Sequence, residues 1–103
     1  MKSELLHTIL SVVSDICEIN ENEICSHVKR ADVVDARVLF IYYCHKYGFP
    51  PASVTKFVGR ARTSCVTDAL YNYKNFSRQS AAFRYLCTEM GKKLADILPI
   101  ENA

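Results

Sequence analysis

Apolar residues recur at helical spacing along most of the chain. Over about residues 2–16 they fall three or four positions apart and form one side of a helix; they are Leu5, Leu6, Ile9, Val12, Val13 and Ile16. A polar stretch from Glu18 to Glu23 follows, and Asn20 or Asn22 within it can cap a short helical turn that ends near Ser26. The pattern therefore predicts an amphipathic first helix and a short turn after it.

A third helix is predicted from about Ala31 to Tyr47, with Asp32 near its start and Gly48 just after its end. Its apolar side includes Val34, Val38 and Ile41, with His45 at its edge, and is widened by Leu39, Tyr42 and Tyr43. The segment 49–51, Phe-Pro-Pro, cannot continue this helix, because proline lacks an amide hydrogen and disfavours helix just before it. We expect this helix to be the centre of the core.

Two shorter helices are predicted on either side of Gly59. The first runs from about Pro51 to Val58, because proline suits a first helical turn. Gly59 provides the tight turn, since glycine adopts positive φ without strain. The second begins near Ala61 or Thr63 and ends near Tyr73. The residues of both helices that are expected to face the core are Val54, Phe57, Val58, Cys65, Val66, Ala69, Leu70 and Tyr73.

Near the end of the chain, the pattern predicts a break over residues 72–77. A last amphipathic helix follows from about Arg78 to Leu98 and is weakened at Gly91. Its apolar side is Phe83, Leu86, Met90, Leu94 and Leu98. With only three glycines and three prolines, the composition also disfavours a fold of many short strands. We therefore expect an all-α fold of five or six helices in one domain, 1–103, with a core over 1–73 and an additional C-terminal helix over 77–98.

Charge changes this picture, because it is unevenly distributed. Residues 46–93 carry nine Lys and Arg against two Asp and Glu, whereas residues 1–45 have a net charge of −3 and the whole chain only +2. Such a basic segment suits a polyanion, since Lys and Arg displace the counterions condensed on nucleic-acid phosphates. A solvated basic face with no partner is the alternative interpretation.

Two short helices joined at a glycine, with Arg-x-Arg-Thr-Ser opening the second, form a helix-turn-helix pattern. The predicted contacts to duplex DNA around this turn are Arg60, Arg62, Thr63, Ser64 and Thr67, flanked by Lys56 and Lys46. Arginine binds phosphate or makes bidentate hydrogen bonds to guanine. Short hydroxyl side chains let the start of a helix approach the DNA backbone closely. Because many small helical proteins contain a glycine corner, a purely structural role for this turn stays open.

These residues also resemble a known family. The segments 30–43 and 49–70 resemble the C-terminal DNA-binding domain of the bacterial chromosomal replication initiator DnaA, a helix-turn-helix domain of the Trp-repressor-like type. The matching features, in order and approximate spacing, are Ala36-Arg37, Gly59-Arg60 and Thr63-Ser64. The resemblance covers about residues 5–72, not the last helix. It implies that Lys29 and Arg30 clamp phosphate at the start of the core helix and that Arg60 is the leading DNA contact.

The chain departs from that family in two respects. The family has an Asp-His pair after Gly-Arg that reads the initiator's DNA box, whereas Ala61 and Arg62 stand here, so the box specificity is not carried over. The AAA+ module and its phosphate-binding loop are absent from the sequence, so no nucleotide is expected. The resemblance therefore implies a stand-alone relative of the DNA-binding domain: a small regulator, or a protein of a phage or mobile element.

Other functions find less support in the sequence. No catalytic residue, metal site or cofactor is predicted: the histidines, at 7, 27 and 45, are scattered, and the five cysteines, at 17, 25, 44, 65 and 87, suit free thiols of a reduced core. No signal peptide or membrane span is predicted, and we expect a cytoplasmic, nucleoid-associated protein. The main alternative is a protein-interaction module or adaptor. An aromatic cluster comprises Tyr71, Tyr73, Phe76, Phe83 and Tyr85. This cluster forms either a surface that binds a second copy or another protein, or the joint that packs the last helix onto the core.

Overall fold

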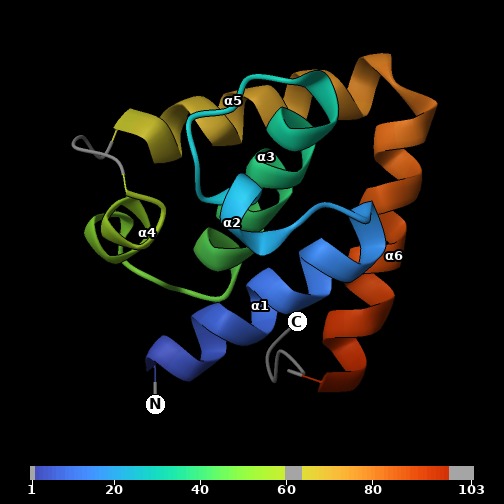
Figure 1. Ribbon diagram of the computed structural model, residues 1–103. Coiled ribbons are helices and arrows are strands. Elements are labelled where there is room, and N and C mark those ends of the chain that lie inside the picture. Colours follow the sequence, from blue (N-terminus) through green and yellow to red (C-terminus); the bar gives the residue numbers. More distant parts are fainter. Residues whose placement is uncertain (1, 60–63, 98–103) are drawn as a thin grey trace.

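The computed structural model describes residues 2–59 and 64–97, and every regular element among them is an α-helix (Figure 1). The helices are α1 (Lys2–Cys17), α2 (Glu21–Ile24), α3 (Ala31–Lys46), α4 (Pro51–Phe57), α5 (Ser64–Gln79) and α6 (Ala81–Ile97). This confirms the predicted all-α class and the additional C-terminal helix. The first and last residues of α1, α3 and α4, and the last residue of α2, also lie within a residue or two of their predicted positions.

The helix α3 lies at the centre of the fold and contacts α1, α2, α4 and α5. It is buried on several sides rather than along one row of residues, which is typical of a core helix. Its most enclosed side chains, all with no exposed area, are Val33, Ala36, Leu39, Phe40 and Cys44. The expectation of a central helix is thus confirmed, although Val34 is only half-buried and His45 is exposed.

The predicted break over residues 72–77 is wrong, because α5 continues through this segment to Gln79. The segment contains no glycine or proline, and Tyr73 and Phe76 within it pack against the ring of Phe83. The chain turns instead at Ser80, whose Oγ accepts a hydrogen bond of 3.1 Å from the Phe83 amide. Such a side-chain cap fixes the start of α6, which begins three residues later than predicted.

The helix α6 turns sharply away from α5 and runs back along α1 (Figure 1). Phe83, Met90 and Leu94 on it are buried and Leu86 is half-buried, as predicted, whereas Leu98 lies outside the described residues. Tyr43 of α3 and the C-cap residue Tyr47 donate hydrogen bonds to α6 carbonyls: Tyr43 to Cys87 at 3.1 Å and Tyr47 to Leu94 at 3.4 Å. Together these contacts attach α6 to the same core as the other helices.

Candidate nucleic-acid interface

The helix α4 ends at the glycine turn that the sequence predicts. Gly59 follows the C-cap residue Val58 and has φ +72°, the left-handed region that glycine adopts without strain. Its amide donates a 3.1 Å hydrogen bond to the Lys56 carbonyl. Val54 and Val58 are fully buried, so α4 is anchored on the core just before the turn.

Replacing Gly59 by alanine is expected to lower the free energy of unfolding by about 1–2 kcal/mol, the cost of a left-handed conformation for an L-residue. A Cβ there would lie 4.0 Å from the Cys25 carbonyl oxygen, an ordinary contact, so the backbone conformation dominates the effect. Gly91→Ala is the matched control. Gly91 lies inside α6 with 3.9 Å to the Tyr43 hydroxyl, and alanine should stabilise this helix by about 0.5–1 kcal/mol. Urea unfolding of both variants measures the difference; equal effects would contradict the turn assignment.

Buried contacts also fix α5 relative to α4 and α3. Thr55 of α4 is buried, and its Oγ1 lies 3.4 Å from the Cys65 Sγ in the first turn of α5. Val66 and Ala69 are buried on the inner side of α5, and the Tyr73 ring stacks on that of Tyr42 with 3.5 Å between centroids. The start of α5 therefore contacts α4, and its middle packs against α3.

The opposite side of α5 is exposed along its whole length. We call this side the outward face. Its members are all exposed, and each lies three or four residues from another member; they are Ser64, Thr67, Asp68, Tyr71, Lys74 and Arg78. Figure 1 shows α5 along one edge of the molecule, on the far side of α3 from α1. From Ser64 to Arg78 the outward face is roughly 21 Å long at the rise of an α-helix. It presents hydroxyls at its start and cationic groups at its end.

Three of the residues predicted to contact DNA near the turn are exposed in the structure. Ser64 and Thr67 lie on the outward face, and Lys56 is exposed in the last turn of α4. Arg60, Arg62 and Thr63 lie outside the described residues. Lys74 and Arg78 were missed, because the predicted break removed them from α5; extending the spacing of three and four residues from Ser64 and Thr67 would have found them.

The remaining predicted residues lie at the two ends of α3. Arg30 is the N-cap residue, and its guanidinium bonds to Asp32 Oδ1 at 2.7 Å and lies 3.4 Å from Glu23 Oε2. The hydrogen bond from Arg30 lowers the pKa of Asp32 below its ordinary value. Lys29 is exposed beside Arg30, whereas Lys46 lies at the other end of α3 with its Nζ 5.6 Å from the Tyr43 ring centre. The structure therefore brings Lys29 and Arg30 together but separates them from Lys46 by roughly the length of the helix, about 24 Å.

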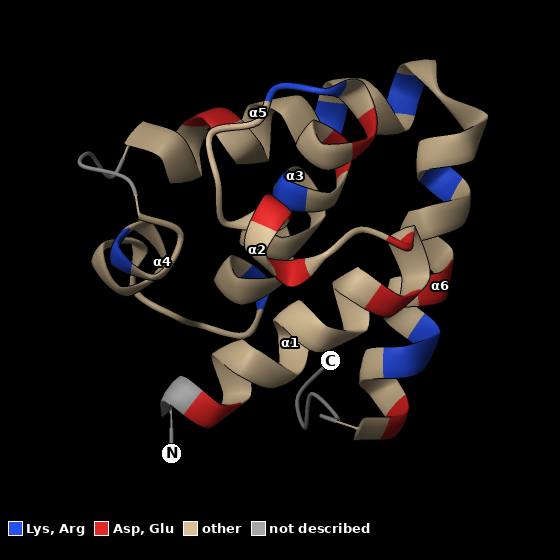
Figure 2. Cartoon of the chain, viewed as in Figure 1, with Lys and Arg blue, Asp and Glu red and all other residues tan. Residues whose placement is uncertain are grey.

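Two arginines serve the fold. Arg37 is buried, and its guanidinium donates to the carbonyls of Ile24 at 2.8 Å, Val28 at 2.9 Å and Glu23 at 3.2 Å. It thereby holds α2 and the loop after it against α3. Arg84 donates at 2.8 Å to the Ser77 carbonyl in the last turn of α5. Figure 2 shows the other basic positions on α4, on the loop after α2, at the end of α3, on α5 and on α6, and acidic positions on α1, α2, α3, α5 and α6.

The aromatic cluster divides into an inner and an outer part. The rings of Tyr73 and Phe76 meet Phe83 edge-on, with centroids 5.6 and 5.4 Å apart, and hold α5 against α6. Tyr71 and Tyr85 are instead 67% and 63% exposed. Core packing is therefore the role of the inner three rings, whereas the outer two rings face the solvent.

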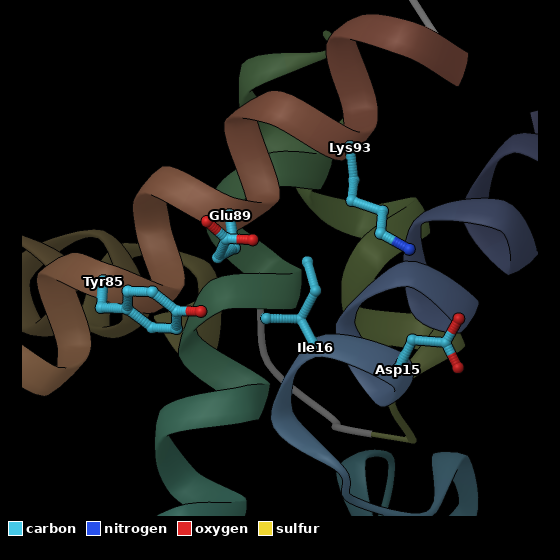
Figure 3. Close-up of a pocket in the computed structure, with 5 residues that line it drawn as sticks. All are labelled: Asp15, Ile16, Tyr85, Glu89 and Lys93. Atoms are coloured by element: carbon cyan, nitrogen blue, oxygen red, sulfur yellow. The ribbon is translucent and has the colours of Figure 1, made fainter.

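A hollow of about 340 Å³ lies between α1 and α6, away from the outward face of α5. Figure 3 shows that Tyr85, Glu89 and Lys93 of α6 and Asp15 and Ile16 of α1 line it. It is an open hollow, and the Glu89 carboxylate is already engaged, 3.5 Å from the Lys92 ammonium. None of its charged groups is buried. The hollow thus lacks the enclosed polar groups that orient a small ligand.

Burial keeps two of the thiols protonated: it raises the pKa of Cys17 to about 11 and that of Cys44 further. These thiols are therefore poor nucleophiles at neutral pH. In residues 2–59 and 64–97, no three His, Cys, Asp or Glu side chains are grouped as metal ligands would be. Within the same ranges, the helices are too short or too polar to span a membrane.

No protein-family model, curated protein or solved structure matches this chain.

Proposed function

We propose that this chain binds duplex DNA through a helix-turn-helix in which α4 is the supporting helix and α5 the recognition helix. The observation that carries the proposal is the outward face of α5. It begins five residues after Gly59, it is polar and exposed, and it is backed by side chains packed on α3 and α4. The two arginines of the turn and the DnaA-like order of residues around it support the same function.

This geometry suits the major groove, which is about 12 Å wide and admits one α-helix. In the proposed complex the start of α5 enters the groove, so that Ser64 and Thr67 reach phosphates or base edges. Arg60 and Arg62 precede that start and contact phosphate or guanine. Lys56, in the last turn of α4, and Lys74 and Arg78, further along α5, lie at positions suited to the phosphate backbone.

The proposed role is that of a small transcriptional or replication regulator. The base-reading pair of the DnaA family is replaced by Ala61 and Arg62, so the duplex that this chain prefers should differ from the initiator's box. Arg30 forms ion pairs with Asp32 and Glu23, so its contribution to phosphate binding should be smaller than that of the arginines of the turn.

The double variant Arg60→Ala with Arg62→Ala tests the proposal. We expect its dissociation constant for a mixed-sequence duplex to rise at least roughly tenfold at moderate salt, and the slope of log affinity against log salt to become shallower by about 1.8, at roughly 0.9 per lost phosphate contact. Fluorescence anisotropy with a labelled duplex, repeated across a salt series, measures both quantities.

The matched control is Lys92→Ala with Lys93→Ala, which removes the same charge from exposed positions on α6. We expect little change in affinity for this variant, because both lysines belong to the C-terminal half of α6, which runs away from α5. Equal losses in the two double variants would show attraction by net charge alone and contradict the helix-turn-helix. If the unmodified chain fails to bind duplex even at low salt, DNA binding is wrong, and the exposed Tyr71 and Tyr85 become the leading surface for a protein partner.

A further inference from the structure

Asp68 is the only acidic residue of α5, and it lies on the outward face, one turn after Ser64. Its side chain is exposed and makes no ion pair within the described part of the chain. A carboxylate is an unexpected group on a surface proposed to face phosphates, because the two repel each other. Asp68 is therefore unsuited to contact phosphate at this position.

Within residues 2–59 and 64–97, neither a helix-start position nor a cationic neighbour on α5 stabilises this carboxylate. Helix-dipole stabilisation of a carboxylate is confined to the first turn, and Asp68 is the fifth residue of α5. The positions three and four residues away on the helix hold Ser64, Cys65, Tyr71 and Asn72, none of them cationic. A shallow groove lies between α3 and α5, and Asp68 is among its lining residues. The basic residue that lines it is Arg37, whose guanidinium already donates to three backbone carbonyls.

The edges of the bases offer a carboxylate a favourable partner in DNA. Cytosine presents its N4 amino group in the major groove, and Asp or Glu accepts a hydrogen bond from it. Adenine also presents an amino group, but its N7 acceptor lies beside it and repels a second carboxylate oxygen. The first turns of a recognition helix are the part that contacts base edges, and Asp68 is placed there.

We infer that Asp68 accepts a hydrogen bond from a cytosine N4 amino group, so that the preferred duplex has a C·G pair at the position facing the second turn of α5. This inference rests on the proposed function. It assigns Asp68 a role in specificity rather than affinity. The carboxylate lowers the affinity for DNA of any sequence, and its hydrogen bond to cytosine compensates for this loss only where cytosine faces it. No acidic residue elsewhere on α5 shares this role.

The test begins with selection of bound duplexes from a random pool by the unmodified chain. Dissociation constants are then measured for the selected duplex with each of the four base pairs at each position. We expect one position at which C·G binds roughly 5–100-fold more tightly than the other pairs. For Asp68→Asn, we expect the cytosine preference to be lost and adenine to be favoured at the same position, because asparagine pairs with the N6 and N7 of adenine.

Asp15→Asn is the control, since it removes one exposed carboxylate from α1, on the other side of the molecule from α5. It should leave the preference at every position unchanged. If Asp68→Asn retains the cytosine preference, or changes the affinity for all sequences equally, the inference is wrong while DNA binding stands. If the unmodified chain binds duplex but selects no cytosine, the inference is again wrong. If it binds no duplex at all, both the inference and the proposed function are overturned.

Discussion

Replacing Phe83 by alanine is expected to lower the free energy of unfolding by about 4 kcal/mol, within the range for a buried aromatic residue. Phe83 is 1% exposed, and its ring lies between those of Tyr73 and Phe76, where α5 turns into α6. The substitution removes the apolar contacts of the ring and leaves a cavity that the two helices can only partly fill. For a domain of this size, the melting temperature should fall by about 15–20 °C.

Thermal and urea unfolding, each followed by circular dichroism, measure this effect. Tyr85→Ala is the matched control, because Tyr85 is an aromatic residue of the same helix with 63% of its surface exposed. Its removal should change stability by less than about 0.5 kcal/mol. Two separate unfolding transitions in the Phe83 variant would contradict a single core, since they would mean that α6 unfolds independently of the other helices.

Arg37→Met is expected to cost about 3 kcal/mol. The guanidinium of Arg37 donates hydrogen bonds to the carbonyls of Ile24, Glu23 and Val28, and methionine leaves these oxygens without that donor. A buried ion pair can often be replaced by apolar groups at little cost, but only when both partners are replaced. Here the carbonyls remain, so the loss is not offset.

Arg37→Lys separates charge from geometry. A single ammonium cannot reproduce the planar fork that meets three carbonyls, so we expect lysine to recover less than half of the lost stability. Arg78→Met controls for the loss of one arginine at an exposed position and should be near neutral. A stability of the Arg37→Met variant within about 0.5 kcal/mol of the unmodified chain would show that α2 and its loop are held by other contacts.

The sequence predicted best those parts of the fold where local chemistry decides the backbone. Gly48 ends α3 and Pro51 opens α4, because one tolerates positive φ and the other has no amide to lose. Gly59 marks the turn before α5 for the same reason as Gly48. The outward position of Ser64 and Thr67 followed from helical spacing alone. All of these signals lie within a few residues of the feature that they predict.

The parts that the sequence did not predict depend on contacts between distant residues. The continuation of α5 past residue 72 is stabilised by the stacking of Tyr73 on Tyr42, thirty-one positions earlier. Similarly, the sequence shows Arg37 only as one basic residue of the Ala-Arg pair, because its three partners precede it by nine to fourteen positions. Asp68 could be noted from composition, but its place on the outward face required the true register and length of α5.

The return of α6 alongside α1 has a practical consequence. The first turn of α1 and the last turn of α6 lie on one side of the molecule, and α5 lies on the other (Figure 1). A fluorophore or affinity handle attached to a residue in either of these turns therefore lies on the side of the molecule away from α5. Immobilising the protein through such an attachment leaves α5 turned toward the solution.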